Sequence, residues 1–196
     1  MNGLIVINKE SGITSQGVVS KVKKILNEKK VGHIGTLDPM AEGVLPILVG
    51  SYTKISKYLI QHDKTYIATI KFGIKTDTAD SEGNIVEEKE VNIKNITKED
   101  FNIILKSFLG ESMQMPPKYS AIKINGKKLY EYARNNVEVE IMPRKITIYD
   151  IEALNIDSMQ NELVFKVSCS KGTYIRTLCE DISNKINTVR IHEKTK

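Results

Sequence analysis

Residues 32–46, GHIGTLDPMAEGVLP, constrain the fold of this chain more than any other stretch. The three glycines in it let the backbone turn and approach a ligand closely, and Pro39 favours an extended backbone at Asp38. An apolar run, Val44–Val49, follows at once and is typical of a strand. The stretch therefore predicts a shaped loop, anchored on a strand, that presents a single aspartate carboxylate.

Spacing alone leaves two interpretations of Asp38 open. An Asp-Pro pair is more often part of a turn than a nucleophile, because the carboxylate readily bonds nearby backbone. The sequence excludes several other chemistries: the three histidines lack metal-ligand spacing, and no nucleophile elbow or dinucleotide fingerprint is present. We therefore expect no metal and no cofactor.

The composition of the 196 residues, 40% hydrophobic and 27% charged, is that of a soluble globular protein. No apolar run reaches the length of a membrane span, and the first residues lack the features of a secretion signal. Two cysteines, Cys169 and Cys179, lie in segments with core-like patterns, which favours a reducing compartment over a disulfide scaffold. We expect a cytoplasmic protein.

The charge of +5 is unevenly distributed. Residues 1–75 carry a net charge of +6 and residues 112–196 a net charge of +4, whereas residues 76–111 carry −5. Basic clusters such as Lys123–Lys128 are often only solvated, but they can also contact a polyanion. The acidic middle is expected to face away from such a partner.

Alternating apolar patterns predict strands, and patterns of helical period predict helices. The expected strands are 3–8, 44–49, 64–75, 85–90, 119–124, 137–141, 146–153 and 163–168. The first expected helix begins at Thr14 and has Val18, Val22, Ile25 and Leu26 on one face. Three more are expected over 53–60, 97–109 and 129–134, and a last helix begins at Thr173. Because strands outnumber helices and hairpins are common, we expect an α/β protein of the α+β type, with a mixed, largely antiparallel sheet and flanking helices.

Three further features indicate a site. Tyr66 begins a strand, where its ring either faces a cleft or is simply half-buried. Arg176 lies in the first turn of the last helix, where a cation opposes the helix dipole, so either a nearby anion offsets it or it reaches solvent. Residues 170–173 join a strand to that helix, and their backbone N–H groups form a candidate anion seat.

Four segments resemble, in order, the motifs of the TruB family, the bacterial tRNA pseudouridine synthases that modify uridine 55 in the TΨC arm. These segments are residues 32–46, DKTYIA at 63–68, PPKYSAIKINGKKLYEYAR at 116–134 and CSKGTYIRTL at 169–178. The resemblance runs from Gly3 to about Ile186. It implies the pseudouridine synthase fold.

The resemblance also implies roles for particular residues. Asp38 matches the catalytic nucleophile, and Tyr66 matches the tyrosine that stacks on the flipped base and assists removal of the proton from C5. Arg176 matches the arginine that pairs with the aspartate. His33 and Tyr174 match residues that contact the RNA around the target nucleotide. We also expect Lys9, which matches a family lysine, to contact the substrate.

The family implies further expectations about partners. The tRNA TΨC arm is the expected partner, with no membrane, no obligatory protein partner and no cofactor, and a monomer is expected. A carboxylate that attacks the sugar or helps to expel the base fits the isomerisation, and the sequence leaves both routes open.

Two departures from the family pattern concern the ends of the chain. Residues 8–10 read Asn-Lys-Glu where the family usually has Asp-Lys-Pro. The end reads NTVRIHEKTK where the family continues with a Leu-Arg-Arg strand and commonly a small RNA-binding domain. We therefore expect an incomplete catalytic domain at 1–186, a divergent tail at 187–196 and no C-terminal RNA-binding domain.

The preferred hypothesis is a tRNA pseudouridine synthase that depends on Asp38. The main alternative is a non-catalytic, truncated RNA-binding remnant of the same family, which would bind tRNA without turnover. A third hypothesis, a hydrolase that releases free uracil, is disfavoured because no second carboxylate is placed to activate water.

Overall fold

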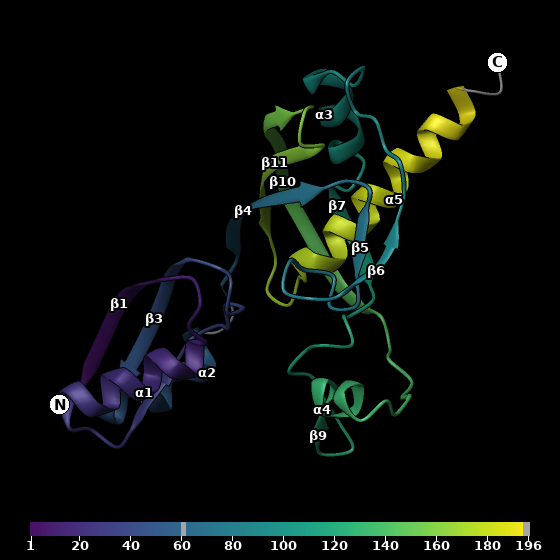
Figure 1. Cartoon of the computed structure of the whole chain (residues 1–196). Helices are drawn as coiled ribbons and strands as arrows, with labels where there is room; N and C mark the ends of the chain where they lie inside the picture. Colours follow the sequence, from purple (N-terminus) through teal and green to yellow (C-terminus); the bar gives the residue numbers. More distant parts are fainter. Residues whose placement is uncertain (60–61, 194–196) are drawn as a thin grey trace. The chain divides into compact units, whose positions relative to one another are not determined.

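The computed structural model describes residues 1–59 and 62–193, with side chains described up to residue 186. The chain divides into two compact units, Met1–His62 and Asp63–Lys196, which we call unit 1 and unit 2 (Figure 1). The domain boundaries expected from the sequence, 1–186 and 187–196, stay a prediction.

Unit 1 contains a three-stranded antiparallel sheet, a helix across one face of it and two short helical turns (Figure 1). Its elements are β1 (Gly3–Lys9), α1 (Ser15–Leu26), β2 (Val31–His33), β3 (Gly43–Val49), η1 (Gly50–Ile55) and α2 (Ser56–Leu59). The strand order is β1-β3-β2. The register pairs Gly3 with Val49 and Lys9 with Gly43, so Lys9 lies where the aspartate loop joins β3.

Helix α1 begins as the sequence predicts. The Thr14 hydroxyl accepts a hydrogen bond from the Gly17 N–H at 2.9 Å, which caps the helix. Val18 and Val22 are buried against β3, but Ile25 is 79% exposed, so the prediction that it faces inward is wrong. Ile25 lies about 60° around the helix from Val22, on the edge of the buried face.

Unit 2 is built on a four-stranded antiparallel sheet in the order β4-β11-β10-β7, with two further two-stranded ladders, β5-β6 and β8-β9. Its strands are β4 (Lys64–Lys71), β5 (Ile74–Thr76), β6 (Ile85–Glu88), β7 (Gly110–Gln114), β8 (Lys123–Ile124), β9 (Lys127–Lys128), β10 (Arg144–Asp157) and β11 (Glu162–Cys169). Its helices are α3 (Lys98–Lys106), α4 (Leu129–Arg134) and α5 (Ile175–Glu193).

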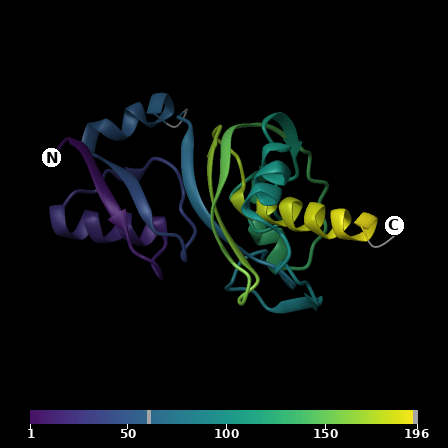
Figure 2. The same cartoon turned by 90° about the horizontal axis from the view of Figure 1, so that it is seen from above.

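Helices α3 and α5 pack on the same face of the four-stranded sheet (Figure 2). The core between them is fully apolar and includes Phe101, Leu105, Leu163, Phe165, Val167, Leu178, Ile182 and Ile186. The rings of Phe72 and Phe101 stack with centroids 5.9 Å apart. This core fixes the start of α5, and with it the position of Arg176 within unit 2.

The structure confirms the expected fold class, because every described strand pair is antiparallel and the helices pack against sheets. The structure also confirms strands over 44–49 and 163–168, the helix at 129–134 and the Asn125-Gly126 turn, where both residues have positive φ. The helix expected over 53–60 is η1 followed by α2, and residue 60 lies outside the described residues.

Several expected boundaries are wrong. The strand expected over 64–75 ends at Lys71, because the chain turns at Gly73, whose φ is +89°. Strand β10 extends from Arg144 to Asp157, and α3 ends at Lys106. No strand forms over 137–141, and only Lys123–Ile124 of the strand expected over 119–124 forms.

Two differences concern strands at sheet edges. Its apolar residues predict that β1 is a buried strand, but it is buried on one face only, since Leu4 is 50% and Val6 62% exposed. Strand β7 was not predicted, because residues 110–114, GESMQ, lack an alternating apolar pattern. Pairing with β10 is what makes this polar segment a strand.

Candidate active site

The loop between β2 and β3, residues 34–42, presents Asp38 and is called the aspartate loop below. Two backbone contacts hold it immediately after Asp38. The Gly12 N–H donates to the Pro39 carbonyl at 3.0 Å, and the Ala41 N–H donates to the Asp38 carbonyl at 3.1 Å. The Ala41 bond closes a backbone turn at Asp38-Pro39, Asp38 is partly buried, and its role as a nucleophile stays a prediction.

Lys9, the last residue of β1, also holds the aspartate loop. Its side chain is 1% exposed, and its ammonium donates to the carbonyls of Glu10, Ile13 and Pro39 at 2.9, 2.7 and 2.9 Å. Three carbonyls compensate a buried ammonium that would otherwise lose much of its hydration energy. This geometry favours a role in holding the aspartate loop, and the expected contact of Lys9 with substrate stays a prediction.

Ser15 holds the loop immediately before Asp38. Its hydroxyl accepts from the Leu37 N–H and donates to the Leu37 carbonyl, both at 2.9 Å, and the residue is 2% exposed. Ser15 was not predicted as a residue of the site. The signal was present, since Ser15 follows the N-cap Thr14, but a sequence does not show which distant backbone a buried hydroxyl will meet.

His33 ends β2 at the start of the aspartate loop. Its Nδ1 lies 2.6 Å from the Gly35 carbonyl, and the ring is partly buried. If Nδ1 carries the proton, Nε2 is left as an acceptor. The expected contact of His33 with RNA stays a prediction.

Arg176 lies in the first turn of α5 and is held by three groups of unit 2. Its guanidinium donates to the Thr78 carbonyl at 3.2 Å, to Asp80 Oδ2 at 3.2 Å and to the Tyr119 carbonyl at 3.1 Å. The side chains of Arg176 and Asp80 are 17% and 11% exposed. Asp80 is therefore an anion that offsets the cation at this helix start, as one of the two sequence interpretations required.

Asp80 is itself fixed, because its Oδ1 accepts from the Thr78 hydroxyl at 2.7 Å and from the Glu82 N–H at 3.1 Å. From the sequence, residues 80–84 are expected only to form a turn. Pairing with Arg176 joins residues far apart in the chain, and no local pattern indicates it. The pairing of Arg176 with Asp38 that the family resemblance implies stays a prediction.

Gln114 joins the end of β7 to the segment before Arg176. Its Nε2 donates to the Tyr174 carbonyl at 3.0 Å, and its Oε1 accepts from the Tyr174 N–H at 2.8 Å. The Thr177 hydroxyl also donates to the Met115 carbonyl at 3.2 Å. Gln114, only 4% exposed, was also missed, because nothing in residues 110–114 marks it.

Tyr66 lies on β4 opposite Val167 of β11 and packs partly buried against the core of unit 2. This position agrees with one of the two alternatives that the sequence left open for Tyr66, a half-buried residue of a strand. The role in base stacking stays a prediction, as does the RNA contact of Tyr174.

At the anion seat expected at residues 170–173, the backbone N–H groups of Ser170 and Thr173 bond within the chain, and binding of an anion there stays a prediction. The Ser170 N–H donates to the Thr147 carbonyl, the Thr173 N–H to the Ser170 carbonyl, and the Tyr174 N–H to Gln114. The Ser170 hydroxyl in turn accepts from the Thr147 N–H at 2.9 Å. These contacts tie the turn to β10 and use N–H groups that an anion would need.

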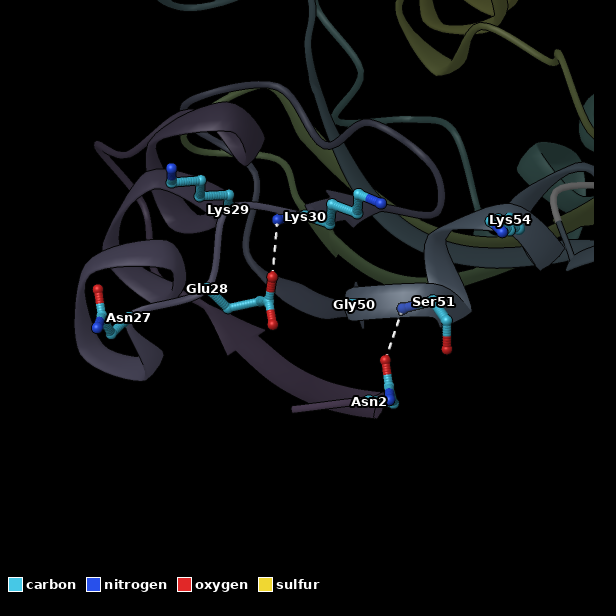
Figure 3. Close-up of a pocket in the computed structure, with 8 residues that line it drawn as sticks. All are labelled: Asn2, Asn27, Glu28, Lys29, Lys30, Gly50, Ser51 and Lys54. Atoms are coloured by element: carbon cyan, nitrogen blue, oxygen red, sulfur yellow. Dashed lines mark hydrogen bonds between the residues drawn. The ribbon is translucent and has the colours of Figure 1, made fainter.

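An open pocket of about 560 Å³ lies at the opposite end of the unit 1 sheet from Lys9, and Lys29, Lys30 and Lys54 are among the residues that line it (Figure 3). The Glu28 carboxylate there accepts from the Lys30 N–H, and Asn2 Oδ1 accepts from the Ser51 N–H. The Lys29 and Lys30 side chains point in different directions (Figure 3). No set of groups in this pocket converges on one ligand position.

Within the described residues, no group of three His, Cys, Asp or Glu side chains is placed to hold a metal ion. No helix in the described part of the chain is both long and apolar enough to cross a membrane.

The fold and the aspartate loop define the class of protein. The model of the TruB family pseudouridylate synthase N-terminal domain matches residues 23–175, and the chain belongs to this family.

Similarity to curated proteins supports this assignment to the family. The chain is 51% identical over 187 residues to the tRNA pseudouridine synthase B of Clostridium kluyveri, covering 95% of this chain and 63% of that protein. It is 52% identical over 182 residues to the protein of the same name from Alkaliphilus oremlandii, covering 93% of this chain and 59% of that protein. The chain thus spans about six-tenths of the length of these relatives.

Solved structures show the same fold. A chain of a Cbf5-Nop10-Gar1 complex superposes with a TM-score of 0.67 at 31% identity, covering 92% of this chain and 43% of that chain. A chain of an H/ACA RNP bound to a substrate RNA containing 2′-deoxyuridine superposes with a TM-score of 0.64 at 28% identity, covering 92% and 42%. The expected pseudouridine synthase fold is confirmed.

Proposed function

We propose that this chain converts uridine to pseudouridine at position 55 in the TΨC loop of tRNA, with Asp38 as the nucleophile. Membership of the family supports the reaction class, and the names of the curated relatives support tRNA as the substrate. The reaction would take place in the cytoplasm, and the protein would act as a monomer without a protein partner.

The observation that carries this proposal is the way unit 1 holds the aspartate loop. The Leu37–Asp38 peptide is bonded to Ser15, and the Pro39 carbonyl, one peptide beyond Asp38, is bonded to Gly12 and Lys9, so the backbone around the carboxylate is held in place. A nucleophile needs such a support, because a reacting atom must be presented in near-attack geometry.

The chemistry requires only groups that the chain has. The N1–C1′ bond of uridine breaks, the base turns, a C5–C1′ bond forms, and the proton on C5 is lost while N1 gains one. Asp38 either attacks C1′ or helps to expel the base, so the intermediate is either covalent or glycal-like. Nothing is oxidised or reduced, and the proposal needs no cofactor.

The other residues act on binding and charge. Tyr66 would stack on the flipped base, offset part of the few kcal/mol that unstacking costs, and assist removal of the C5 proton. Arg176 would favour the charged form of Asp38. His33, Tyr174 and Lys9 would contact the RNA or hold the site around the target nucleotide.

The test is single-turnover pseudouridine formation on an unmodified tRNA transcript, with the parent chain, Asp38→Asn and Glu42→Gln. Glu42 is an exposed carboxylate of the same loop and serves as the matched control. We expect product at the TΨC-loop uridine from the parent and from Glu42→Gln, and none from Asp38→Asn, while all three bind tRNA equally.

Other outcomes would contradict the proposal. If folded parent chain binds tRNA in a salt-sensitive manner but forms no product, the non-catalytic RNA-binding alternative replaces it. Release of free uracil, with loss of the base from the RNA, would indicate a hydrolase instead.

A further inference from the structure

Ser15 has an unusual pair of hydrogen bonds for a helix residue. It is the first residue of α1, it is 2% exposed, and its hydroxyl bonds both the N–H and the carbonyl of Leu37 at 2.9 Å. The capping function at this helix end belongs to Thr14, whose hydroxyl binds Gly17. The Ser15 hydroxyl therefore bonds the aspartate loop and does not cap its own helix.

The bond to the Leu37 carbonyl fixes the peptide group that carries Asp38, and the bond from the Leu37 N–H fixes the peptide before it. The Leu37 carbonyl and the Asp38 nitrogen belong to one planar peptide unit, so a bond to that carbonyl orients the unit as a whole. On the other side of Asp38, the Pro39 carbonyl accepts from the Gly12 N–H and from the Lys9 ammonium. Ser15 thus anchors the Leu37–Asp38 peptide directly, whereas Gly12 and Lys9 anchor the Pro39–Met40 peptide, one unit beyond Asp38.

We propose that Ser15 is a positioning residue for Asp38, an inference that rests on the proposed function. Without the Ser15 hydroxyl, the Leu37–Asp38 peptide can rotate, and the Asp38 carboxylate is no longer held in one position. Misplacement of a reacting group by about 1 Å can reduce a rate about 100-fold. The loss falls on the chemical step, because Ser15 is buried and does not contact RNA.

The experiment compares Ser15→Ala with Thr14→Ala. Each variant loses one hydroxyl at the start of α1, but only Ser15→Ala loses the bonds to Leu37. At a temperature where circular dichroism shows both variants folded, we expect Ser15→Ala to lower the single-turnover rate at least about tenfold, with tRNA Kd unchanged. Thr14→Ala should keep the parent rate. Equal rates for the two variants, or a loss confined to Kd, would overturn the proposal.

Amide hydrogen exchange distinguishes this proposal from the proposed function. If the parent forms no product, the function fails, and the exchange rate of the Leu37 N–H still shows whether Ser15 anchors the loop. We expect faster exchange at Leu37 in Ser15→Ala than in Thr14→Ala. Equal protection in the two variants would refute the anchoring itself.

A separate observation in unit 2 carries a second inference. The Gln114 amide pairs with both backbone groups of Tyr174, as a neighbouring strand would, and it is 4% exposed. The Tyr174 carbonyl also accepts from the Leu178 N–H, so it opens the hydrogen-bond ladder of α5. Gln114 therefore holds Tyr174, the residue immediately before α5 and two residues before Arg176.

We infer that Gln114 is a positioning residue for Arg176, an inference that also rests on the proposed function. The matched control is Asn102, whose side-chain oxygen accepts from the Ala153 N–H at 2.9 Å elsewhere in unit 2. We expect Gln114→Ala to lower the single-turnover rate, measured at saturating tRNA, at least about tenfold. Asn102→Ala should lower stability without this loss of rate.

A rate for Gln114→Ala equal to that of Asn102→Ala would overturn the inference. If the parent is inactive, the amide hydrogen exchange rate of the Tyr174 N–H tests whether Gln114 anchors the start of α5. Faster exchange in Gln114→Ala than in Asn102→Ala supports the anchoring of α5, and equal exchange refutes it.

Discussion

Lys9 is the largest side chain of unit 1 that is almost completely enclosed. Its ammonium bonds three carbonyls, one of which belongs to the aspartate loop. Hydrogen bonds to a charged group contribute more than those between neutral groups, and the carbonyls left behind would lack this partner. The residue therefore combines loop geometry with stability.

We predict that Lys9→Met lowers the free energy of unfolding by about 3 kcal/mol, measured by urea titration. Lys21→Met, which removes an exposed lysine from α1, should leave it within about 0.5 kcal/mol. Unchanged stability of Lys9→Met together with weaker tRNA binding would instead support the substrate contact expected from the family.

Cys179 lies on α5 and packs against the core of unit 2. Burial raises the pKa of its thiol from 9.0 to about 12, and the nearby Glu180 carboxylate adds to the rise. Because only the thiolate reacts, a rise of this size reduces the reactive fraction at pH 8 about 1000-fold.

Alkylation by iodoacetamide at pH 8 should therefore be at least about 100-fold slower at Cys179 in the folded chain than in urea. Mass spectrometry of the peptide that contains Cys179 follows the reaction. Rapid labelling of the native chain would contradict the packing described for α5.

Helix α3 has a complete capping box. The Thr97 hydroxyl accepts from the Asp100 N–H, and Asp100 accepts from the Thr97 N–H at 3.0 Å and from its hydroxyl at 2.8 Å. The bonds from Thr97 hold the pKa of Asp100 below its usual value of 3.8. The carboxylate therefore stabilises the folded chain above about pH 3.8, and this contribution is lost as the pH falls through the lowered pKa.

We predict that the unfolding free energy of the parent falls more steeply between pH 5 and pH 3 than that of Asp100→Asn. Asparagine keeps the acceptor but does not titrate. Urea titrations at several pH values measure both slopes, with Glu99→Gln as the control for loss of a neighbouring carboxylate. Parallel slopes for the parent and Asp100→Asn would contradict the role of the cap.

For the whole molecule, charge is the property that bears most on RNA binding. The β8-β9 hairpin places Lys123 opposite Lys128 and adds Lys127 beside them. Like charges directly opposite on neighbouring strands repel, and a polyanion removes this repulsion. The acidic stretch 76–111, in contrast, offers RNA little attraction.

We predict that replacing Lys123, Lys127 and Lys128 by Gln makes the dependence of log K on log salt for tRNA binding shallower by about 2. The matched control replaces Lys89, Lys94 and Lys106, which lie in the acidic stretch, and should leave the slope unchanged. Filter binding at several salt concentrations measures both, and equal slopes for the two triple variants would place the RNA elsewhere.

Local chemistry made several features predictable. Thr14 and Thr97 cap helices, the Asn125-Gly126 pair turns a hairpin, and alternation marked β4 and β11, because these features depend on neighbours in the chain. The order of motifs that resemble TruB predicted the family. The position of Asp38 on a turn before a strand also followed from Gly and Pro alone.

The contacts that hold the candidate site were decided only by tertiary structure. Ser15 meets Leu37, Asp80 meets Arg176, and Gln114 meets Tyr174 across 22, 96 and 60 residues. Such pairings have no periodicity, because a buried polar group is satisfied by whichever backbone or charge the fold brings to it. The polar strand β7 formed for the same reason, since β10 supplied its hydrogen-bond partners. The sequence indicates Asp38 and Arg176 as candidates for the chemistry, whereas long-range packing selects the groups that hold the aspartate loop and the start of α5.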